Sequence, residues 1–247
     1  RITINNPERR NAISLEMWQG ISEAFDAFGA DPAVRCVVME GAGDKAFASG
    51  ADISQFKENR SNAEAAAEYA KISMSGRQKM LSCEKPFIAK IRGFCMGGGL
   101  GIALAADIRI ASVDSQFGVP AARLSIAYDR VNLGNLMALV GPSKTKEILI
   151  TAKRYSAAEA AAIGLINACV PVADLDAAVT DMTDRIAENA PLSMRATKLT
   201  VNELLKDDAA FDTDLVAVLT KACFDSRDYQ EGQDAFMNKR KPAFEGR

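Results

Sequence analysis

Chemistry is most readily carried by the main chain in two glycine-bearing loops, which lie within the segments Cys36–Ser54 and Pro86–Asp107. The 247 residues include no histidine, which removes the commonest general base, every Ser-His-Asp or Cys-His arrangement and the usual zinc ligands. Proton transfer must therefore fall to Asp, Glu, Tyr, Lys, Cys or water. The strongest local signal is Gly97-Gly98-Gly99, which lies between a predicted strand and a predicted helix over Leu100–Ala106.

The glycine triplet predicts a cluster of exposed amide donors. Amides at the start of a helix lack internal acceptors, and glycine lets a ligand atom approach them without a Cβ in the way. A thioester or enolate oxygen is one candidate ligand, and a phosphate is another. The sequence lacks GxGxxG with its acidic partner and the GK[ST] of a P-loop, which disfavours nucleotides. A tight turn with close helix packing is the structural alternative.

Composition indicates a soluble globular protein. Apolar residues make up 48% and charged residues 25%. The net charge is −2, whereas a nucleic-acid binder is expected to carry an excess of basic residues. Five cysteines without a CxxC pair predict reduced thiols and a cytoplasmic location. The longest apolar stretch, Cys95–Ala106, is too short to span a membrane. The chain starts inside a predicted strand, so we expect native residues to precede Arg1.

The elements that must position the glycine loops follow an α/β pattern. A helix is predicted over Ser14–Ala30, with Ser14 as its N-cap. Strands are predicted over Val34–Glu40, Pro86–Arg92, Asp107–Ser112 and Leu165–Pro171. From Ala173 onward no further strands are predicted. Helices are predicted there over Ala173–Asn189, Leu192–Leu205, Ala209–Asp225 and Asp228–Lys239. The strand, glycine loop and helix recur, which favours a degenerate repeat over a doubly wound sheet.

Several ordered motifs together resemble the crotonase superfamily, the enoyl-CoA hydratase/isomerase family. They cover nearly the whole chain. The matching segments are Asn5–Ser14, Lys45–Ser54, Lys85–Leu100, Ala106–Ser112, Tyr155–Asn167 and Asp228–Phe244. The resemblance implies a spiral of strand-strand-helix turns over residues 1–190. It also implies a helical oligomerisation region over 191–247 that builds a homotrimer or a dimer of trimers.

The resemblance further implies an acyl-CoA thioester substrate, with coenzyme A as part of that substrate and with no metal or other cofactor. Two backbone amides of this family form an oxyanion hole for the thioester enolate, and by motif they fall on Ser49 and Gly98. Asp52, three residues after Ser49, is read as the N-cap of the following helix. The residues that match the family's CoA contacts are Ala46, Ala48, Ala51, Ile53, Phe236 and Lys239.

The sequence departs from the hydratases of this family at both catalytic glutamates. The two positions carry Gly101 and Ala121, neither of which can hold a water or move a proton. Asp129 lies where dienoyl-CoA isomerases and the chlorobenzoyl-CoA dehalogenase carry a catalytic aspartate, and Tyr128 matches a tyrosine of methylmalonyl-CoA decarboxylase. The structural alternative is a core tyrosine and a helix N-cap. Arg123 and Arg130 flank the loop and are candidates to receive a substrate carboxylate.

The sequence therefore predicts a double-bond isomerase or a decarboxylase that uses Asp129 and Tyr128. An ordinary enoyl-CoA hydratase and a catalytically silent acyl-CoA-binding protein are the alternatives. RNA binding is disfavoured, because Lys71, Arg77 and Lys79 form no i, i+4 stripe on their predicted helix.

Overall fold

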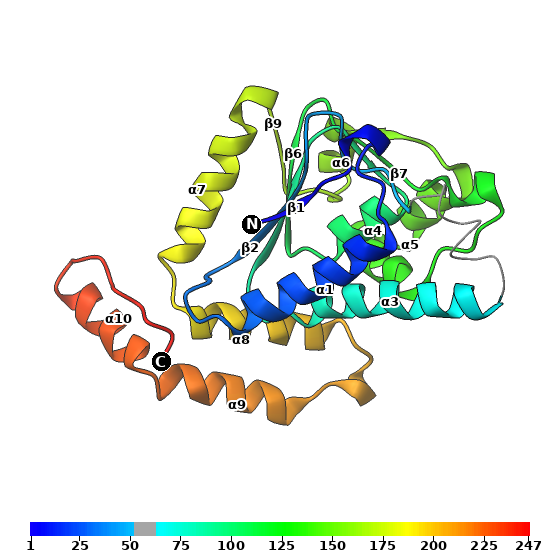
Figure 1. The fold of residues 1–247 in the computed structure, drawn as a ribbon. Helices are drawn as coiled ribbons and strands as arrows, with labels where there is room; N and C mark the ends of the chain where they lie inside the picture. The colour runs from blue at the N-terminus through cyan, green and yellow to red at the C-terminus, as the bar shows by residue number, and fades with distance from the viewer. Residues whose placement is uncertain (52–62) are drawn as a thin grey trace.

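The structure, a computed structural model, describes residues 1–51 and 63–247 and arranges them around two sheets (Figure 1). The larger sheet contains, in spatial order, β1 (Ile2–Ile4), β2 (Val37–Gly41), β4 (Phe87–Ile91), β6 (Ile108–Ser112) and β9 (Ala168–Val170). The smaller sheet contains β3 (Ala46–Ala48), β5 (Phe94–Met96), β7 (Gln116–Gly118) and β8 (Tyr155–Ser156). All neighbouring strands are parallel except β7 and β8.

Helices connect and cover the two sheets (Figure 1). In the described part of the chain they are α1 (Leu15–Ala30), α3 (Ala63–Ser82), α4 (Gly98–Leu104), α5 (Arg130–Thr151), α6 (Ala157–Ala162), α7 (Leu175–Ala187), α8 (Pro191–Leu204), α9 (Thr213–Phe224) and α10 (Arg227–Met237). A turn of the fold places one strand in the larger sheet, the next in the smaller sheet, and then a helix. The predicted strand-strand-helix spiral is confirmed.

Both faces of the larger sheet are buried. Val37, Met39 and Phe87 pack into the main core on one face, while Val38 and Ile88 pack on the other face against α7. Successive side chains of a strand point to opposite faces, so a sheet covered on both sides needs continuous apolar runs. This explains why the long strands were visible in the sequence.

The predicted elements agree with the structure to within a few residues. Ser14 caps α1 by accepting a hydrogen bond from the Met17 amide at 3.2 Å. Four strands of the larger sheet coincide with the predicted runs, although each is shorter. The strands of the smaller sheet were not predicted, because each has only two or three residues.

The C-terminal helices extend beyond the two-sheet core (Figure 1). Arg195 of α8 is bonded to Glu84 at 2.6 Å, and Lys198 is bonded to Asp107 at 2.8 Å. These ion pairs attach α8 to the core, while α9 and α10 lie outside it. The division of the chain into a spiral core over 1–190 and an oligomerisation region over 191–247 remains a prediction. Among the described residues, no helix combines the length and apolar character needed to cross a bilayer.

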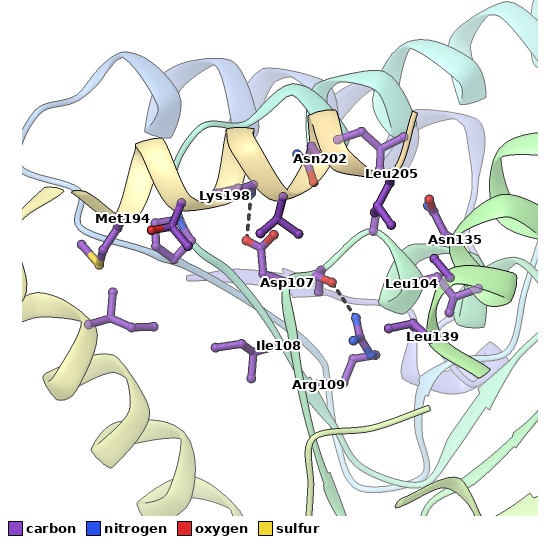
Figure 2. Close-up of a pocket in the computed structure, with 18 of the residues that line it drawn as sticks. Leu104, Asp107, Ile108, Arg109, Asn135, Leu139, Met194, Lys198, Asn202 and Leu205 are labelled. Atoms are coloured by element: carbon purple, nitrogen blue, oxygen red, sulfur yellow. Dashed lines mark hydrogen bonds and ion pairs between the residues drawn. The ribbon is translucent and has the colours of Figure 1, made fainter. Parts of the chain in front are cut away.

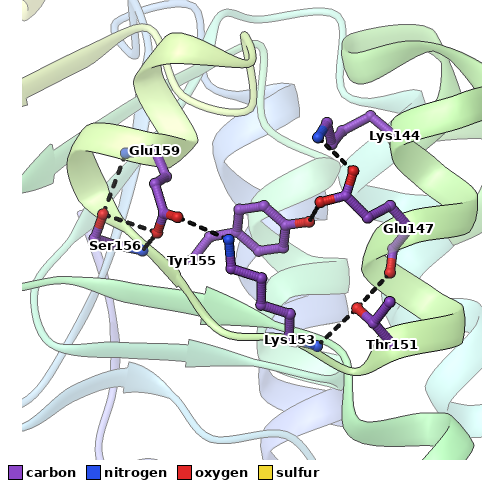
Figure 3. A network of polar contacts seen from close by, with 7 residues as sticks. All are labelled: Lys144, Glu147, Thr151, Lys153, Tyr155, Ser156 and Glu159. Atoms are coloured by element: carbon purple, nitrogen blue, oxygen red, sulfur yellow. Dashed lines mark hydrogen bonds and ion pairs between the residues drawn. The ribbon is translucent and has the colours of Figure 1, made fainter.

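A network of charged side chains fixes β8 beside the end of α5 (Figure 3). Glu159 accepts from Lys153 at 2.8 Å and closes a capping box with Ser156 at the start of α6. Tyr155 donates to Glu147 at 2.7 Å. The hydrogen bond from Lys153, supported by those from Ser156, lowers the pKa of Glu159 to about 2.

We expect this network to make stability depend on pH in the acid range. The folded-state pKa of Glu159 lies below its usual 4.5, so its contribution is present above pH 4.5 and is lost as the pH falls towards 2. Glu159→Gln should lower the melting temperature slightly at pH 7, and the difference from wild type should vanish near pH 2. A constant difference across this range would contradict the assignment.

Candidate active site

A cavity of about 550 Å³ opens between α1, α3, the start of α4 and the segment before α5. It brings together residues that the sequence marked as functional but that are spread over 80 positions of the chain. The marked residues among its lining are Ser49, Ala51, Gly98, Ala121, Tyr128 and Asp129. Apolar side chains of Ile13, Trp18, Met74, Val119, Leu124 and Ile126 supply much of the remaining wall. The four residues predicted to be catalytic therefore line one cavity.

Ala51 lines this cavity, and its amide is the first available donor. Ile13 and Ala51 form an isolated parallel bridge, in which the Gly50 carbonyl accepts from the Ile13 amide at 2.8 Å. In a trans peptide the carbonyl and the following N–H point in opposite directions, so the Ala51 N–H is directed away from Ile13. Within the described chain it has no hydrogen-bond acceptor.

The Gly98 amide is the second available donor. The Gly97 carbonyl accepts from the Gly101 amide at 3.1 Å, and the Gly98 N–H on the opposite side of the same peptide has no acceptor among the described residues. A Cβ placed on Gly98 would stand 3.5 Å from the Ala51 nitrogen, so it would intrude on the space in front of that amide. Gly99 is required for packing, because a Cβ there would collide with the Ala48 carbonyl oxygen.

Ser49 is not available as the first donor, which corrects the sequence-based expectation. Its amide already donates to the Arg10 carbonyl at 3.0 Å, and its hydroxyl donates to the Arg9 carbonyl at 3.2 Å. The Ala51 amide, two positions later in the same loop, has no partner among the described residues. Strand pairing with residues 10–13 occupies the Ser49 amide, and that pairing is not visible in a local motif.

Asp129 lies at the cavity and also caps α5. Its Oδ1 accepts from the Asn132 amide at 3.0 Å, and its Oδ2 accepts from the Asn132 side chain at 2.6 Å and from Arg77 at 3.1 Å. The side chain nevertheless keeps 40% exposure. The structural alternative for Asp129, a helix N-cap, is therefore confirmed. The same residue lines the cavity together with Ala51 and Gly98.

Tyr128 is directed at the glycine loop. Its hydroxyl donates to the Gly97 carbonyl at 3.2 Å. Burial, with a smaller contribution from the Asp129 carboxylate, raises the pKa of Tyr128 well above its usual value, so the phenol remains protonated. The hydroxyl therefore already has an acceptor in the protein.

The positions of the two absent glutamates are occupied differently. A Cβ on Gly101 would lie 2.7 Å from the Asn132 side-chain nitrogen, and Asn132 is buried and bonded to Asp129. Asn132 therefore fills the space that a side chain at position 101 would need. Ala121 lines the cavity but carries no polar group. Asp129 is the sole carboxylate in the cavity lining that the structure describes.

Arg77 is the functional candidate that sequence reasoning missed. It extends from α3, pairs with Asp129 and stacks over the Trp18 ring at 5.4 Å. Arg123 and Arg130, which the sequence marked instead, are exposed and do not line the cavity. Arg77 lies 52 residues before Asp129, so neither spacing nor helical pattern links the two.

The residues expected to bind coenzyme A are dispersed. Ala46 and Ala48 are buried in β3 and only Ala51 lines the cavity, while Asp52 and Ile53 lie outside the described residues. Phe236, 83% exposed, belongs to α10, and Lys239 follows that helix. Figure 1 shows α10 apart from the helices that surround the cavity. Within one chain, the last two residues do not reach this site.

A second hollow of about 810 Å³ lies beneath α8 (Figure 2). Its charged groups are already bonded within the protein. Asp107 accepts from Lys198 and from the Phe87 amide, and buried Arg109 donates to the carbonyls of Ala106 and Leu165. Arg109 also donates to the Ala103 carbonyl near the C-terminal end of α4 at 3.4 Å. This hollow offers apolar surface from α8 rather than groups for chemistry.

Comparison with known proteins agrees with this geometry. Residues 1–247 match the family described as enoyl-CoA hydratase/isomerase. The chain belongs to the enoyl-CoA hydratase/isomerase family. Within this family it is 36% identical to a crotonyl-CoA hydratase of Syntrophomonas wolfei subsp. wolfei, over 98% of this chain and 92% of that protein. It is 31% identical to a peroxisomal Delta(3,5)-Delta(2,4)-dienoyl-CoA isomerase of Arabidopsis thaliana, over 98% of this chain and 91% of that protein.

Solved structures of the family share the whole fold. A crystal structure of an enoyl-CoA hydratase/carnithine racemase from Magnetospirillum magneticum has a TM-score of 0.94 and 38% identity, over 99% of this chain and 91% of that one. The crotonase fold predicted from the motifs is therefore confirmed. Both hydratase and isomerase relatives align along nearly the whole chain, so overall similarity leaves the reaction of this family member to be argued from its site.

Proposed function

We propose that the cavity binds an acyl-CoA thioester and that the Ala51 and Gly98 amides receive its carbonyl oxygen. The observation that carries this proposal is a pair of amides, on two residues that line one cavity, without an acceptor among the described residues. Donors fixed in advance stabilise an oxyanion with little reorganisation, and loss of one such donor lowers rates by about 10²–10³. The bound thioester would therefore form an enolate with its negative charge at these two amides. The acyl-CoA substrate class follows from the family.

The proposed reaction is double-bond isomerisation or decarboxylation. In the first, a base removes a proton from the acyl chain and returns it at another carbon. In the second, the electrons of the bond to the departing carboxylate pass into the thioester carbonyl, and a proton then replaces the lost CO₂. We assign the proton transfer to Asp129 in either case, because it is the carboxylate among the described residues that line the cavity. Neither reaction needs glutamates at positions 101 and 121.

Two alternatives have specific support. The similarity to a crotonyl-CoA hydratase favours hydration, with a water held by groups other than the two glutamates. The three hydrogen bonds that fix Asp129 favour an acyl-CoA-binding protein without turnover. The cytoplasmic location remains a prediction.

A panel of acyl-CoA thioesters followed by mass spectrometry distinguishes these possibilities. The panel should contain conjugated and non-conjugated enoyl-CoAs, dienoyl-CoAs and acyl-CoAs that carry a second carboxylate. Unchanged mass with a new retention time indicates isomerisation, loss of CO₂ indicates decarboxylation, and gain of water indicates hydration. Binding of a thioester without any product would support the silent protein. A chain that binds no thioester would contradict the proposal as a whole.

We also propose a homotrimer or a dimer of trimers, built by the C-terminal helices. Large apolar side chains are more than half exposed on these helices and just after α8, including Leu204, Leu205, Val218, Phe224, Phe236 and Met237. A single chain in water rarely exposes so many neighbouring apolar groups. Phe236 and Lys239 are distant from their own cavity, so their proposed contact with coenzyme A requires a neighbouring subunit.

Sedimentation equilibrium or light scattering should therefore report a mass of three or six chains. The mass should fall when Leu204 and Leu205 are both replaced by serine, whereas the exposed Met74→Ser on α3 should leave it unchanged. A monomer at micromolar concentration would contradict both the assembly and the proposed role of Phe236 and Lys239.

A further inference from the structure

The Gly97–Gly98 peptide carries two functions on opposite sides of one plane. Its N–H, from Gly98, is one of the two proposed oxyanion donors. Its carbonyl oxygen, from Gly97, accepts from the Gly101 amide at 3.1 Å and from the Tyr128 hydroxyl at 3.2 Å. Because the peptide is planar and trans, any group that holds the carbonyl also fixes the direction of the N–H.

We propose that Tyr128 is a positioning residue of the oxyanion site, which acts through the Gly97–Gly98 peptide rather than on the substrate. This inference rests on the proposed function. Hydrogen bonds in a chain polarise one another, so donation to the Gly97 oxygen makes the Gly98 N–H a stronger donor. The proposed chain of hydrogen bonds runs from the Tyr128 hydroxyl to the Gly97 carbonyl, and from the Gly98 amide of the same peptide to the thioester oxygen.

The surroundings of Tyr128 suit this role. Its hydroxyl has one hydrogen, and that hydrogen is already donated to the Gly97 oxygen. Gly97 has φ 53° and ψ −117°, a conformation that a residue with a side chain rarely adopts. A loop in this conformation is oriented by the contacts at its carbonyl and amide. The Gly97 amide is held as well, since it donates to the Gly118 carbonyl at 2.8 Å.

The other proposed donor has a simpler arrangement. Its carbonyl partner, the Gly50 oxygen, accepts from the Ile13 amide, a main-chain group that substitution leaves in place. Among the described residues, Tyr128 is therefore the side chain whose substitution can change the strength of the proposed oxyanion site without altering either amide.

The test is the absorption spectrum of a bound 4-dimethylaminocinnamoyl-CoA. This conjugated thioester absorbs at longer wavelength when its carbonyl is polarised by hydrogen bonds. Wild-type protein should produce a red shift, and Tyr128→Phe should produce a smaller one at saturating ligand. On the substrate identified by the panel, Tyr128→Phe should lower kcat by about 3- to 10-fold with little change in KM, as expected for one hydrogen bond. The control is Tyr155→Phe, which also removes a phenol oxygen, but from the network around Glu147. Its red shift and kcat should equal those of wild type.

The possible spectra separate the inference from the proposed function. An undiminished red shift in Tyr128→Phe would overturn the inference and leave the proposed function standing, whereas no red shift in wild-type protein would overturn the proposed function itself. If Tyr128→Phe fails to fold, 3-fluorotyrosine at position 128 keeps the ring and makes the hydroxyl a stronger donor. It should increase the red shift, and an unchanged or smaller shift would again overturn the inference.

Discussion

Replacing Asp129 with asparagine should lower turnover of the preferred acyl-CoA by about 10²- to 10⁴-fold, the range for loss of a general acid or base. Asparagine has nearly the same size and is itself a good N-cap, so α5 should remain capped by acceptance from the Asn132 amide. Thioester binding should change little, whereas the melting temperature should fall modestly because asparagine cannot replace the carboxylate as the acceptor for Arg77. Steady-state kinetics, ligand titration and thermal unfolding of the same preparation check the three expectations.

The matched control is Asp212→Asn. Asp212 caps α9 as Asp129 caps α5, with its Oδ1 accepting from the Leu215 amide at 2.8 Å, but it does not line the cavity. Turnover of Asp212→Asn should equal that of wild type. Full activity in Asp129→Asn would assign Asp129 to the cap alone, and the proton would then have to be moved by bound water.

Crotonyl-CoA should be hydrated at least about 10³-fold more slowly than by a hydratase with both glutamates, because two proton-transfer groups are absent and each is worth about 10²–10⁴. Gly101 and Ala121 provide no carboxylate, and Asn132 occupies the space beside Gly101. Loss of the conjugated thioester absorbance measures the rate. The crotonyl-CoA hydratase of Syntrophomonas wolfei, assayed in parallel, is the positive control.

The contact between Asn132 and position 101 allows a second test with engineered variants. Introducing Gly101→Glu and Ala121→Glu together should fail to produce a fast hydratase, because any side chain at position 101 would collide with Asn132. Adding Asn132→Gly should remove that obstacle and raise the hydration rate above that of the double variant. Fast hydration by the unmodified protein would show that groups other than these glutamates activate water here.

Much of the fold could be predicted because its strongest signals are local. Buried strands such as Phe87–Ile91 are continuous apolar runs, and helices such as Leu15–Ala30 repeat apolar residues every three or four positions. The smaller sheet had no such signal. Ala46–Ala48 and Gln116–Gly118 are too short to show a period, and they are strands because the neighbouring turn of the spiral supplies partners. Pairing of that kind depends on residues about 50 and 20 positions away.

The site was predictable where a motif carries it and unpredictable where packing does. Gly98, Tyr128 and Asp129, which the sequence predicts to be catalytic, line one cavity, and they could be singled out because the glycine triplet and the loop after Pro120 are conspicuous in the sequence. The proposed donor at Ala51 depends on a bridge to Ile13, and the partner of Asp129 is an arginine from another helix. Neither the bridge nor the ion pair can be recognised from the spacing of these residues in the sequence. The cap at Asp129 and its place in the cavity were posed as alternatives, whereas the structure shows both together.

The order of strands in the two sheets also bears on how the chain is made. In each sheet the strands follow one another in space as they do along the chain. A strand leaving the ribosome therefore finds its neighbour already synthesised, and no later strand has to insert between two that have paired. In doubly wound sheets, by contrast, strands are added on both sides of the first one. Since the N-terminal part of a chain is synthesised first, each turn of the spiral emerges after the turn whose strands it pairs with.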